Sequence, residues 1–229
     1  MPPSTAPLPD YAAARDHMVD SQVRPNKVID PRIIRAMRQL PRERFVPPAL
    51  AARAHADEDV PLPGGRALME PMVIARLVQL LRIVAGDSVL VLAAGSGYGA
   101  ALLDACGARV TALEDDPAML ALARAVLPAV APGVMLVEGP VAAGWPDGAP
   151  YDAILIEGAV PAIPDSLAAL LRPDTGRLAT VRIQPGALCQ GVLAEAVHVG
   201  AETRLRAQAF FDCATPMLPQ FTPAAAFTF

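Results

Sequence analysis

Short apolar segments and amphipathic segments alternate along the middle of the chain. Continuous apolar runs are typical of strands buried on both faces, and the segments with helical spacing between them suit the crossovers that parallel strands need. The pattern predicts a doubly wound, mostly parallel α/β sheet. The expected strands are residues 88–93, 109–114, 134–137, 153–157 and 178–183, and the expected helices between them are residues 98–106, 117–126 and 163–171.

Two later apolar runs follow one another without a helix between them. Residues 191–199 and 205–211 therefore predict an antiparallel hairpin at the sheet edge, which brings the sheet to seven strands. Helical patterns also precede the sheet, where Asp30 is suited to cap a helix that has Pro31 in its first turn. These earlier elements are expected helices at residues 11–21, 31–39, 47–55 and 71–82, with a loop rich in acids, proline and glycine at residues 57–66.

The elements divide the chain into a flexible arm at residues 1–10 and one domain at residues 11–229. Within the domain we expect a helical cap at residues 11–70, a Rossmann-like core at residues 71–214 and a proline- and phenylalanine-rich tail at residues 215–229. The tail is expected to be irregular and packed by its aromatic side chains. The cap should lie over the carboxyl edge of the sheet, with the 57–66 loop beside the pocket.

Composition narrows the class of protein. The chain has 229 residues, 53% of them apolar, and its net charge of −4 is scattered rather than gathered in patches. We therefore expect neither a nucleic-acid nor a membrane partner. The three cysteines and three histidines share no metal-ligand spacing, so no metal site is predicted. No leader-like or membrane-spanning segment is evident, and reduced thiols suit a cytoplasmic protein.

A glycine-rich turn follows the first strand of the predicted sheet. The sequence SVLVLAAGSGYGAALLDA passes from strand to helix through Ala94, Gly95, Ser96 and Gly97, where small residues let a ligand approach the backbone. Glu114 ends the next strand, and its carboxylate could accept hydrogen bonds from both hydroxyls of a ribose. S-adenosylmethionine and NAD both carry that diol. The turn alone also suits a doubly wound fold that binds no ligand, and Gly95 to Ala100 fits the dinucleotide pattern GxGxxA.

Two features favour the methyl donor over the nicotinamide cofactor. A long N-terminal region precedes the glycine turn, whereas a dinucleotide domain commonly starts close to it. Further on, YDAILIEGAVPAIPDSLAALLRPDTGRL has the order of a fourth strand, a helix and the turn into a fifth strand that class I methyltransferases use. A nicotinamide-dependent oxidoreductase therefore stays a distant alternative.

Several motifs resemble those of protein-L-isoaspartate O-methyltransferases. MVDSQVRPNKVIDPRIIRAMRQLPRERFVPP is similar to the helical N-terminal signature of that family, and HADEDVPLPGG to its "AYaDepLpiG" loop. GSGYGAALL is similar to "GSGYQAAvLA", and GWPDGAPYDAILI to "GWPEhAPYDaIiV". The resemblance covers residues 18–177 and implies S-adenosylmethionine as cofactor and protein or peptide substrates with an isoaspartyl carboxylate. It leaves open whether the chain is a monomer or a homodimer.

The chain departs from the family where the chemistry is expected. The family's "TISqP" segment, whose serine lies beside the substrate, corresponds here to Ala67-Leu68-Met69-Glu70-Pro71. An acid and a glycine of "VLEIGtGSGY" are replaced by Val91 and Ala93, and the aspartate of a "GDG"-like turn by Pro140. Each change also has an ordinary structural explanation, such as core filling or a better strand residue. Three lost contacts of about 1 kcal/mol each would weaken cofactor binding on the order of a hundredfold.

The resemblance and the residues together assign the candidate site. We expect the cofactor at Ala94, Gly95, Ser96, Gly97, Glu114, Asp115 and Gly139, and the acceptor at Met69, Glu70, Pro71 and Glu157. No catalytic residue is assigned, because the family's serine position holds Met69. Glu70 would repel an acceptor carboxylate unless it were paired, for example with Arg66. Glu70 and Glu157 could instead bind a cationic or hydroxyl-bearing acceptor, or be solvated or paired with arginine.

Two functions remain open from the sequence. The chain is expected to be a carboxyl O-methyltransferase acting on isoaspartyl residues or a related acceptor. The alternative is a degenerate relative that binds the cofactor poorly or not at all and acts as an interaction module. Met69, Val91 and Pro140 favour it, as does the tail at residues 215–229, which could dock a partner.

Overall fold

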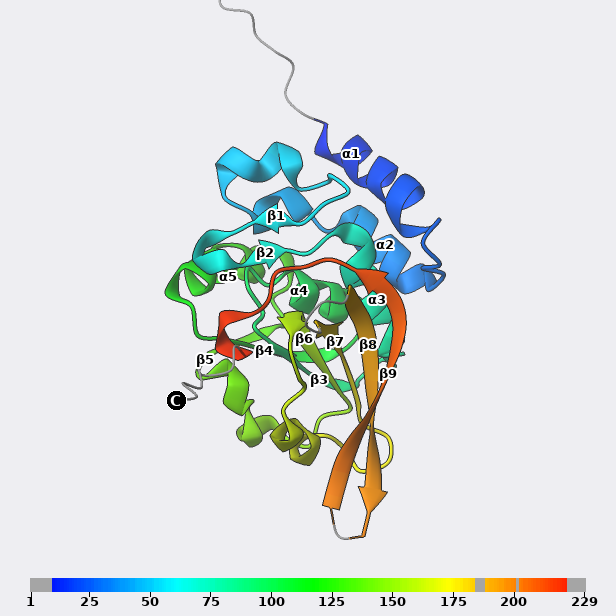
Figure 1. Ribbon diagram of the computed structural model, residues 1–229. Coiled ribbons are helices and arrows are strands. Elements are labelled where there is room, and N and C mark those ends of the chain that lie inside the picture. Colours follow the sequence, from blue (N-terminus) through cyan, green and yellow to red (C-terminus); the bar gives the residue numbers. More distant parts are fainter. Residues whose placement is uncertain (1–9, 184–187, 201, 222–229) are drawn as a thin grey trace, which may run out of the picture.

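A seven-stranded mixed sheet forms the centre of the molecule (Figure 1). The computed structural model describes residues 10–183, 188–200 and 202–221. The strand order is β5-β4-β3-β6-β7-β8-β9, parallel from β5 to β7 and antiparallel from β7 to β9. The expected α/β fold and its C-terminal hairpin are thus confirmed. The strands are β3 (Ser88–Leu92), β4 (Arg109–Glu114), β5 (Met135–Glu138), β6 (Ala153–Val160), β7 (Arg177–Arg182), β8 (Cys189–Val199) and β9 (Glu202–Cys213).

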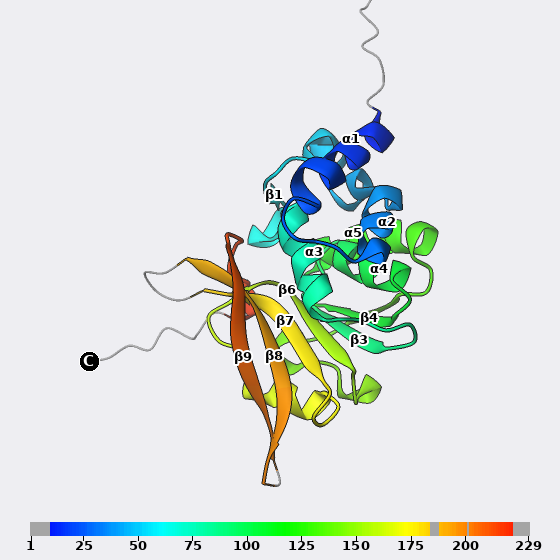
Figure 2. The same cartoon turned by 90° about the vertical axis from the view of Figure 1, so that its right-hand side faces the viewer.

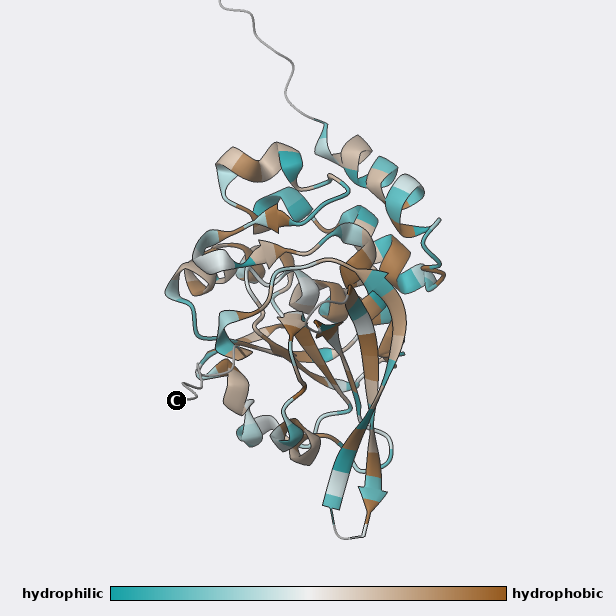
Figure 3. Ribbon diagram, in the orientation of Figure 1, coloured by the Kyte–Doolittle hydropathy of each residue, from teal (hydrophilic) through white to brown (hydrophobic). Residues whose placement is uncertain are grey.

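Alternate residues of the central strands enter two different apolar cores. Val89 and Val91 of β3 pack with the helices on one face, whereas Leu90 and Leu92 pack with the short helices on the other. Figure 2 shows α2 to α5 together on the first face, and Figure 3 shows that the central strands carry the most hydrophobic residues. The α-helices are α1 (Tyr11–Met18), α2 (Pro31–Gln39), α3 (Pro71–Leu80), α4 (Tyr98–Ala105) and α5 (Pro117–Val130).

Several expected helices differ in the structure. The helix expected at residues 163–171 is only a 3-10 helix, η7 (Asp165–Leu170), and it ends before Arg172, for which Pro173 disfavours a helical conformation. The helix expected at residues 47–55 is likewise the 3-10 helix η3 (Pro48–Arg53). The first helix ends at Met18 and continues as a π-helix, η1 (Val19–Val23). The other short helices are η2 (Arg42–Phe45), η5 (Val141–Ala143), η6 (Pro146–Gly148) and η8 (Pro219–Phe221).

The segment expected as a loop at residues 57–66 is a small hairpin. Strands β1 (Val60–Pro61) and β2 (Ala67–Leu68) pair around the turn η4 (Pro63–Gly65). Gly64 and Gly65 adopt φ of 69° and 71°, a left-handed conformation that favours glycine. Arg66 follows the turn, and its backbone is fixed because the Leu62 N–H donates to its carbonyl at 2.8 Å.

The chain termini are described only in part. Residues 1–9, in the expected flexible arm, and residues 222–229, in the expected irregular tail, lie outside the described residues. The described part of the tail contains η8, whose Phe221 is buried in the core on the second face of the sheet. Among the described residues, no helix is both long enough and apolar enough to cross a membrane.

A buried arginine joins the N-terminal segments to the sheet. The Arg42 side chain is fully buried, donates from Nε to the Ala54 carbonyl at 2.6 Å and from Nη2 to the Met69 carbonyl at 2.5 Å. Its guanidinium also lies 4.6 Å from the centre of the Tyr98 ring, at the start of α4. Arg42 therefore holds three parts of the chain together. These are the end of η3, the segment that precedes α3, and the start of α4.

Replacing this arginine tests its structural role. Arg42→Ala should lower the free energy of unfolding by about 3 kcal/mol, because two buried carbonyls lose a charged donor. Urea unfolding measures the loss, and the exposed Arg44→Ala is the matched control, expected to change stability by less than about 0.5 kcal/mol. Similar losses in the two variants would contradict the role assigned to Arg42.

Candidate cofactor and acceptor site

The turn after β3 brings small residues to the carboxyl ends of the central strands. Gly95 and Gly97 have φ of 58° and 92°, and Gly97 caps α4. A Cβ at Gly97 would lie 2.9 Å from a Leu127 methyl carbon, so α5 also requires glycine there. Ala93 takes φ of 54°, a left-handed conformation that costs alanine roughly 1 kcal/mol. The replacement of the family's glycine by Ala93 thus keeps the turn at an energetic cost.

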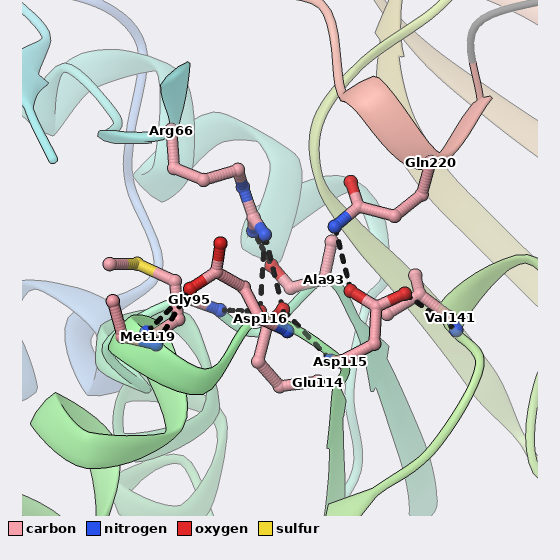
Figure 4. Close-up of polar contacts among 10 residues, drawn as sticks. Arg66, Ala93, Gly95, Glu114, Asp115, Asp116, Met119, Val141 and Gln220 are labelled. Atoms are coloured by element: carbon pink, nitrogen blue, oxygen red, sulfur yellow. Dashed lines mark hydrogen bonds and ion pairs between the residues drawn. The ribbon is translucent and has the colours of Figure 1, made fainter. Parts of the chain in front are cut away.

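Glu114 lies at the end of β4 with its side chain completely buried. Three backbone N–H groups donate to its carboxylate: Gly95 to Oε2 at 2.7 Å, and Asp115 and Asp116 to Oε1 at 3.0 Å each (Figure 4). The glycine turn and the acid, which the sequence predicted to lie together, are thus in direct contact through the hydrogen bond from Gly95 to Glu114. The amide donors favour the ionised carboxylate, which would otherwise be costly to bury.

Arg66 closes the remaining side of Glu114. Its Nη1 lies 3.2 Å from both carboxylate oxygens, and its Nη2 donates to the Ala93 carbonyl at 2.5 Å. Only 3% of the Arg66 side chain is exposed. The suggested pairing of Arg66 with Glu70 is wrong, because the small hairpin directs the guanidinium across the ends of β3 and β4. No periodicity in the sequence marks this contact.

Asp115, the next residue along, is bound by the C-terminal segment. Gln220 in η8 donates from Nε2 to Asp115 Oδ1 at 2.7 Å, and the Val141 N–H approaches Oδ2 at 3.5 Å. Figure 4 shows Gln220 and Arg66 approaching the two neighbouring acids from different segments. Gly139 lies beside them, and its N–H donates to the Glu114 carbonyl at 3.1 Å. Sequence reasoning missed Gln220, since nothing in its local pattern indicates a partner so far away.

The proposed acceptor segment lies at the start of α3. Met69 is buried, with its carbonyl held by Arg42, and Pro71 begins the helix. The Glu70 N–H donates to Asp59 Oδ1 at 2.6 Å. Burial, and then the nearby Asp57 and Asp59, raise the pKa of the Glu70 carboxyl. Glu70 therefore has acids near it, and this part of the site favours positive charge.

Glu157 of β6 is buried against the first turn of α4. A Cβ on Gly99 would lie 2.5 Å from Glu157 Oε2, so the carboxyl fills the space that a side chain at position 99 would need. Burial raises the pKa of Glu157 to about 8, although the positive charges of Arg66 and Arg42 oppose the shift. At neutral pH its neutral form is therefore favoured, and the side chain adds little negative charge to the site.

The structure thus joins most of the predicted cofactor residues around the ends of β3 and β4. Ala94, Ser96 and the two glycines form the turn, while Glu114 lies directly beside it. Val91 instead points into the apolar core on the helical face. Glu114 has the acceptor chemistry that a ribose diol needs, but Arg66 and three amides already bind its oxygens. The acceptor chemistry of Glu114 thus suits a ribose diol, and Arg66 lies against the same two oxygens.

The raised pKa of Glu157 gives a prediction for stability against pH. A carboxyl with a raised pKa in the folded state stabilises the fold fully below its ordinary value of 4.5, and this contribution is lost as pH rises towards 8. The stability of Glu157→Gln relative to the unmodified chain should therefore rise between these pH values, by up to about 5 kcal/mol. Urea unfolding at several pH values measures the gap. The exposed Glu202→Gln is the control, and a pH-independent gap for Glu157→Gln would count against the assignment.

Comparison with known proteins places this chain in a family. Residues 13–190 match the family described as protein-L-isoaspartate(D-aspartate) O-methyltransferase. A protein-L-isoaspartate O-methyltransferase from Methylorubrum extorquens (strain PA1) is 41% identical over 185 residues, which cover 81% of each chain. One from Methanoregula boonei (strain DSM 21154 / JCM 14090 / 6A8) is 40% identical over 175 residues, covering 76% of this chain and 80% of the relative.

Solved structures agree on the fold. One protein-L-isoaspartate O-methyltransferase has a TM-score of 0.69 at 19% identity, covering 85% of this chain and 63% of its own. A Plasmodium falciparum protein, named as a beta-aspartate methyltransferase in complex with S-adenosyl-L-homocysteine, has a TM-score of 0.67 at 15% identity, covering 93% of this chain and all of its own. From the family match and the close relatives together, this chain belongs to the protein-L-isoaspartate(D-aspartate) O-methyltransferase family.

Proposed function

We propose that this chain is an S-adenosylmethionine-dependent carboxyl O-methyltransferase that acts on isoaspartyl residues of proteins or on a related carboxylate. The observation that carries the proposal is the buried Glu114 carboxylate beside the Gly95 N–H, at the ends of two adjacent parallel strands. Open α/β sheets bind ligands at this edge, and a carboxylate there suits a ribose diol. The close relatives that carry the name of this activity support the proposal.

The proposed cofactor site divides into two parts. Glu114 would accept hydrogen bonds from the ribose, and the turn from Ala94 to Gly97 would lie against the adjoining atoms of the ligand. Asp115 and Gly139 would border its adenine end, where Pro140 offers no N–H. When bound, S-adenosylmethionine supplies a methyl group on a positively charged sulfur.

The chain's own contribution to the reaction is mainly positioning. A carboxylate acceptor is ionised at neutral pH, so it attacks the methyl group without a general base. The lack of a hydroxyl at Met69 is therefore compatible with activity, because alignment of the reactants supplies much of the rate enhancement. Met69, Glu70 and Pro71 would line the acceptor side, with Glu157 nearby as a mostly neutral acid.

The acids near Glu70 favour a particular kind of acceptor. Burial, and then the negative charges of Asp57 and Asp59, raise the pKa of Glu70, so a bare acceptor carboxylate would meet further negative charge. An isoaspartyl residue flanked by lysine or arginine would place a cation beside these acids. We therefore expect basic peptides to be better acceptors than acidic ones.

A non-catalytic binding role is the second candidate. It is favoured by the buried Met69 at the position of the family's serine and by the arginine bound to Glu114. The two functions differ in one measurable property, which is methyl transfer.

Methyl transfer to a synthetic peptide tests the proposal. With radiolabelled S-adenosylmethionine, we expect base-labile methylation of an isoaspartyl peptide with flanking lysines, and none of the same peptide with ordinary aspartate. Glu114→Ala should lower kcat/KM for the cofactor by at least about tenfold, because the ribose loses charged acceptors. Glu202→Gln, on the exposed hairpin, serves as the control. No transfer to either peptide at millimolar cofactor would favour the binding role.

A further inference from the structure

The guanidinium of Arg66 occupies the position that a ribose diol needs on Glu114. A diol would present two donors to the two carboxylate oxygens, and Arg66 Nη1 lies 3.2 Å from each of them. Arg66 also covers the glycine turn, since a Cβ on Gly95 would lie 3.7 Å from Arg66 Nη2. The same side chain therefore blocks both surfaces on which an adenosyl ligand would rest.

The acceptor capacity of Glu114 is already used. Oε1 accepts from the Asp115 and Asp116 N–H groups, Oε2 accepts from the Gly95 N–H, and Arg66 reaches both. A carboxylate has about four lone-pair positions. The amides belong to the ends of strands and turns and cannot leave without unfolding them. Among the described residues, Arg66 is the one side-chain donor to Glu114, and it alone can be exchanged for a ligand.

The backbone of Arg66 is held independently of its side chain. The hairpin fixes the backbone through the Leu62 N–H to Arg66 carbonyl bond, and the adjoining Gly64 and Gly65 are exposed. Asp116 borders the same hairpin, because a Cβ on Gly64 would lie 2.6 Å from its Oδ2. This partly exposed carboxylate offers the released guanidinium a second partner.

We propose that Arg66 is an internal occupant of the ribose subsite, and that adenosyl ligands bind this chain by displacing its guanidinium from Glu114. The proposal rests on the proposed function, since it concerns the same cofactor site. It makes Arg66 the residue that sets the affinity for the cofactor. Breaking the buried ion pair costs free energy, and this cost weakens the observed binding of the ligand by the same amount.

Removing the guanidinium should therefore strengthen binding. Without Arg66, the buried Glu114 keeps its three amide donors but regains acceptor capacity, which the ribose hydroxyls can satisfy. A hydrogen-bonded charged pair of this kind corresponds to about tenfold or more in a binding constant. If Arg66 only stabilised the hairpin, its loss would leave the affinity unchanged or lower it.

Calorimetric titration of the full chain with S-adenosylhomocysteine tests the proposal without requiring turnover. We expect Arg66→Gln to bind at least about tenfold more tightly than the unmodified chain, and Arg66→Lys, with one donor nitrogen, to be intermediate. Arg53→Gln is the matched control, because it also removes an arginine that pairs with a glutamate, but Arg53 and its partner Glu58 lie at the surface, before the hairpin. Unchanged or weaker binding by both Arg66 variants would overturn the proposal, as would no binding by any variant.

A second ligand pair ties the effect to the ribose. Adenosine should gain affinity from Arg66→Gln, whereas 2′,3′-dideoxyadenosine, which lacks both hydroxyls, should gain none; equal gains would overturn the proposal. Thermal unfolding of each variant provides a check that it is folded. These titrations do not depend on methyl transfer. If the unmodified chain and the Arg66 variants all bound the ligand equally tightly, this inference would be refuted and the proposed function would stand. Binding by Arg66→Gln alone would support the inference and show that the unmodified chain is closed to its cofactor.

Discussion

The need to satisfy one buried negative charge, that of Glu114, governs how the chain is arranged at the carboxyl ends of the central strands. Glu114 has no exposed surface, so its charge must be satisfied by donors that the fold brings to it. The amide of Gly95 comes from the turn after β3, the next two amides from the turn after β4, and the guanidinium of Arg66 from the small hairpin. Three separate segments are thus held at the ends of the central strands because they share one negative charge.

The N-terminal cap depends on a complementary arrangement around a positive charge. Arg42 carries its guanidinium into the interior, where Nε and Nη2 donate to the carbonyls of Ala54 and Met69 and the group lies against the face of Tyr98, while Nη1 has no hydrogen-bond partner within the described part of the chain. The Met69 carbonyl belongs to the segment that would face the acceptor. Arg42 therefore fixes the backbone of that segment through the Met69 carbonyl, and this contact does not depend on the side chain at position 69.

Periodicity was sufficient to predict the sheet, and the site was only partly predictable. The strand Arg109–Glu114 was predicted at its exact bounds, because burial on both faces leaves a short, mostly apolar segment between two charged residues. The helix expected at residues 163–171 failed, since apolar residues spaced three apart suit a 3-10 helix as well. Glu114 and the glycine turn were visible in sequence because they follow strands directly. Arg66 and Gln220 were not, because loop side chains carry no repeating pattern and their partners are fixed only by tertiary folding.

The packing of Glu157 on Gly99 couples the residue types that these two positions can hold. A Cβ at position 99 would lie 2.5 Å from Glu157 Oε2, so a side chain there would require the buried carboxyl to move. The effect of a substitution at either position therefore depends on the residue at the other, and the free energies of the two single changes are not expected to add. Helix α4 and strand β6 thus form one energetic unit at this point of the sheet edge.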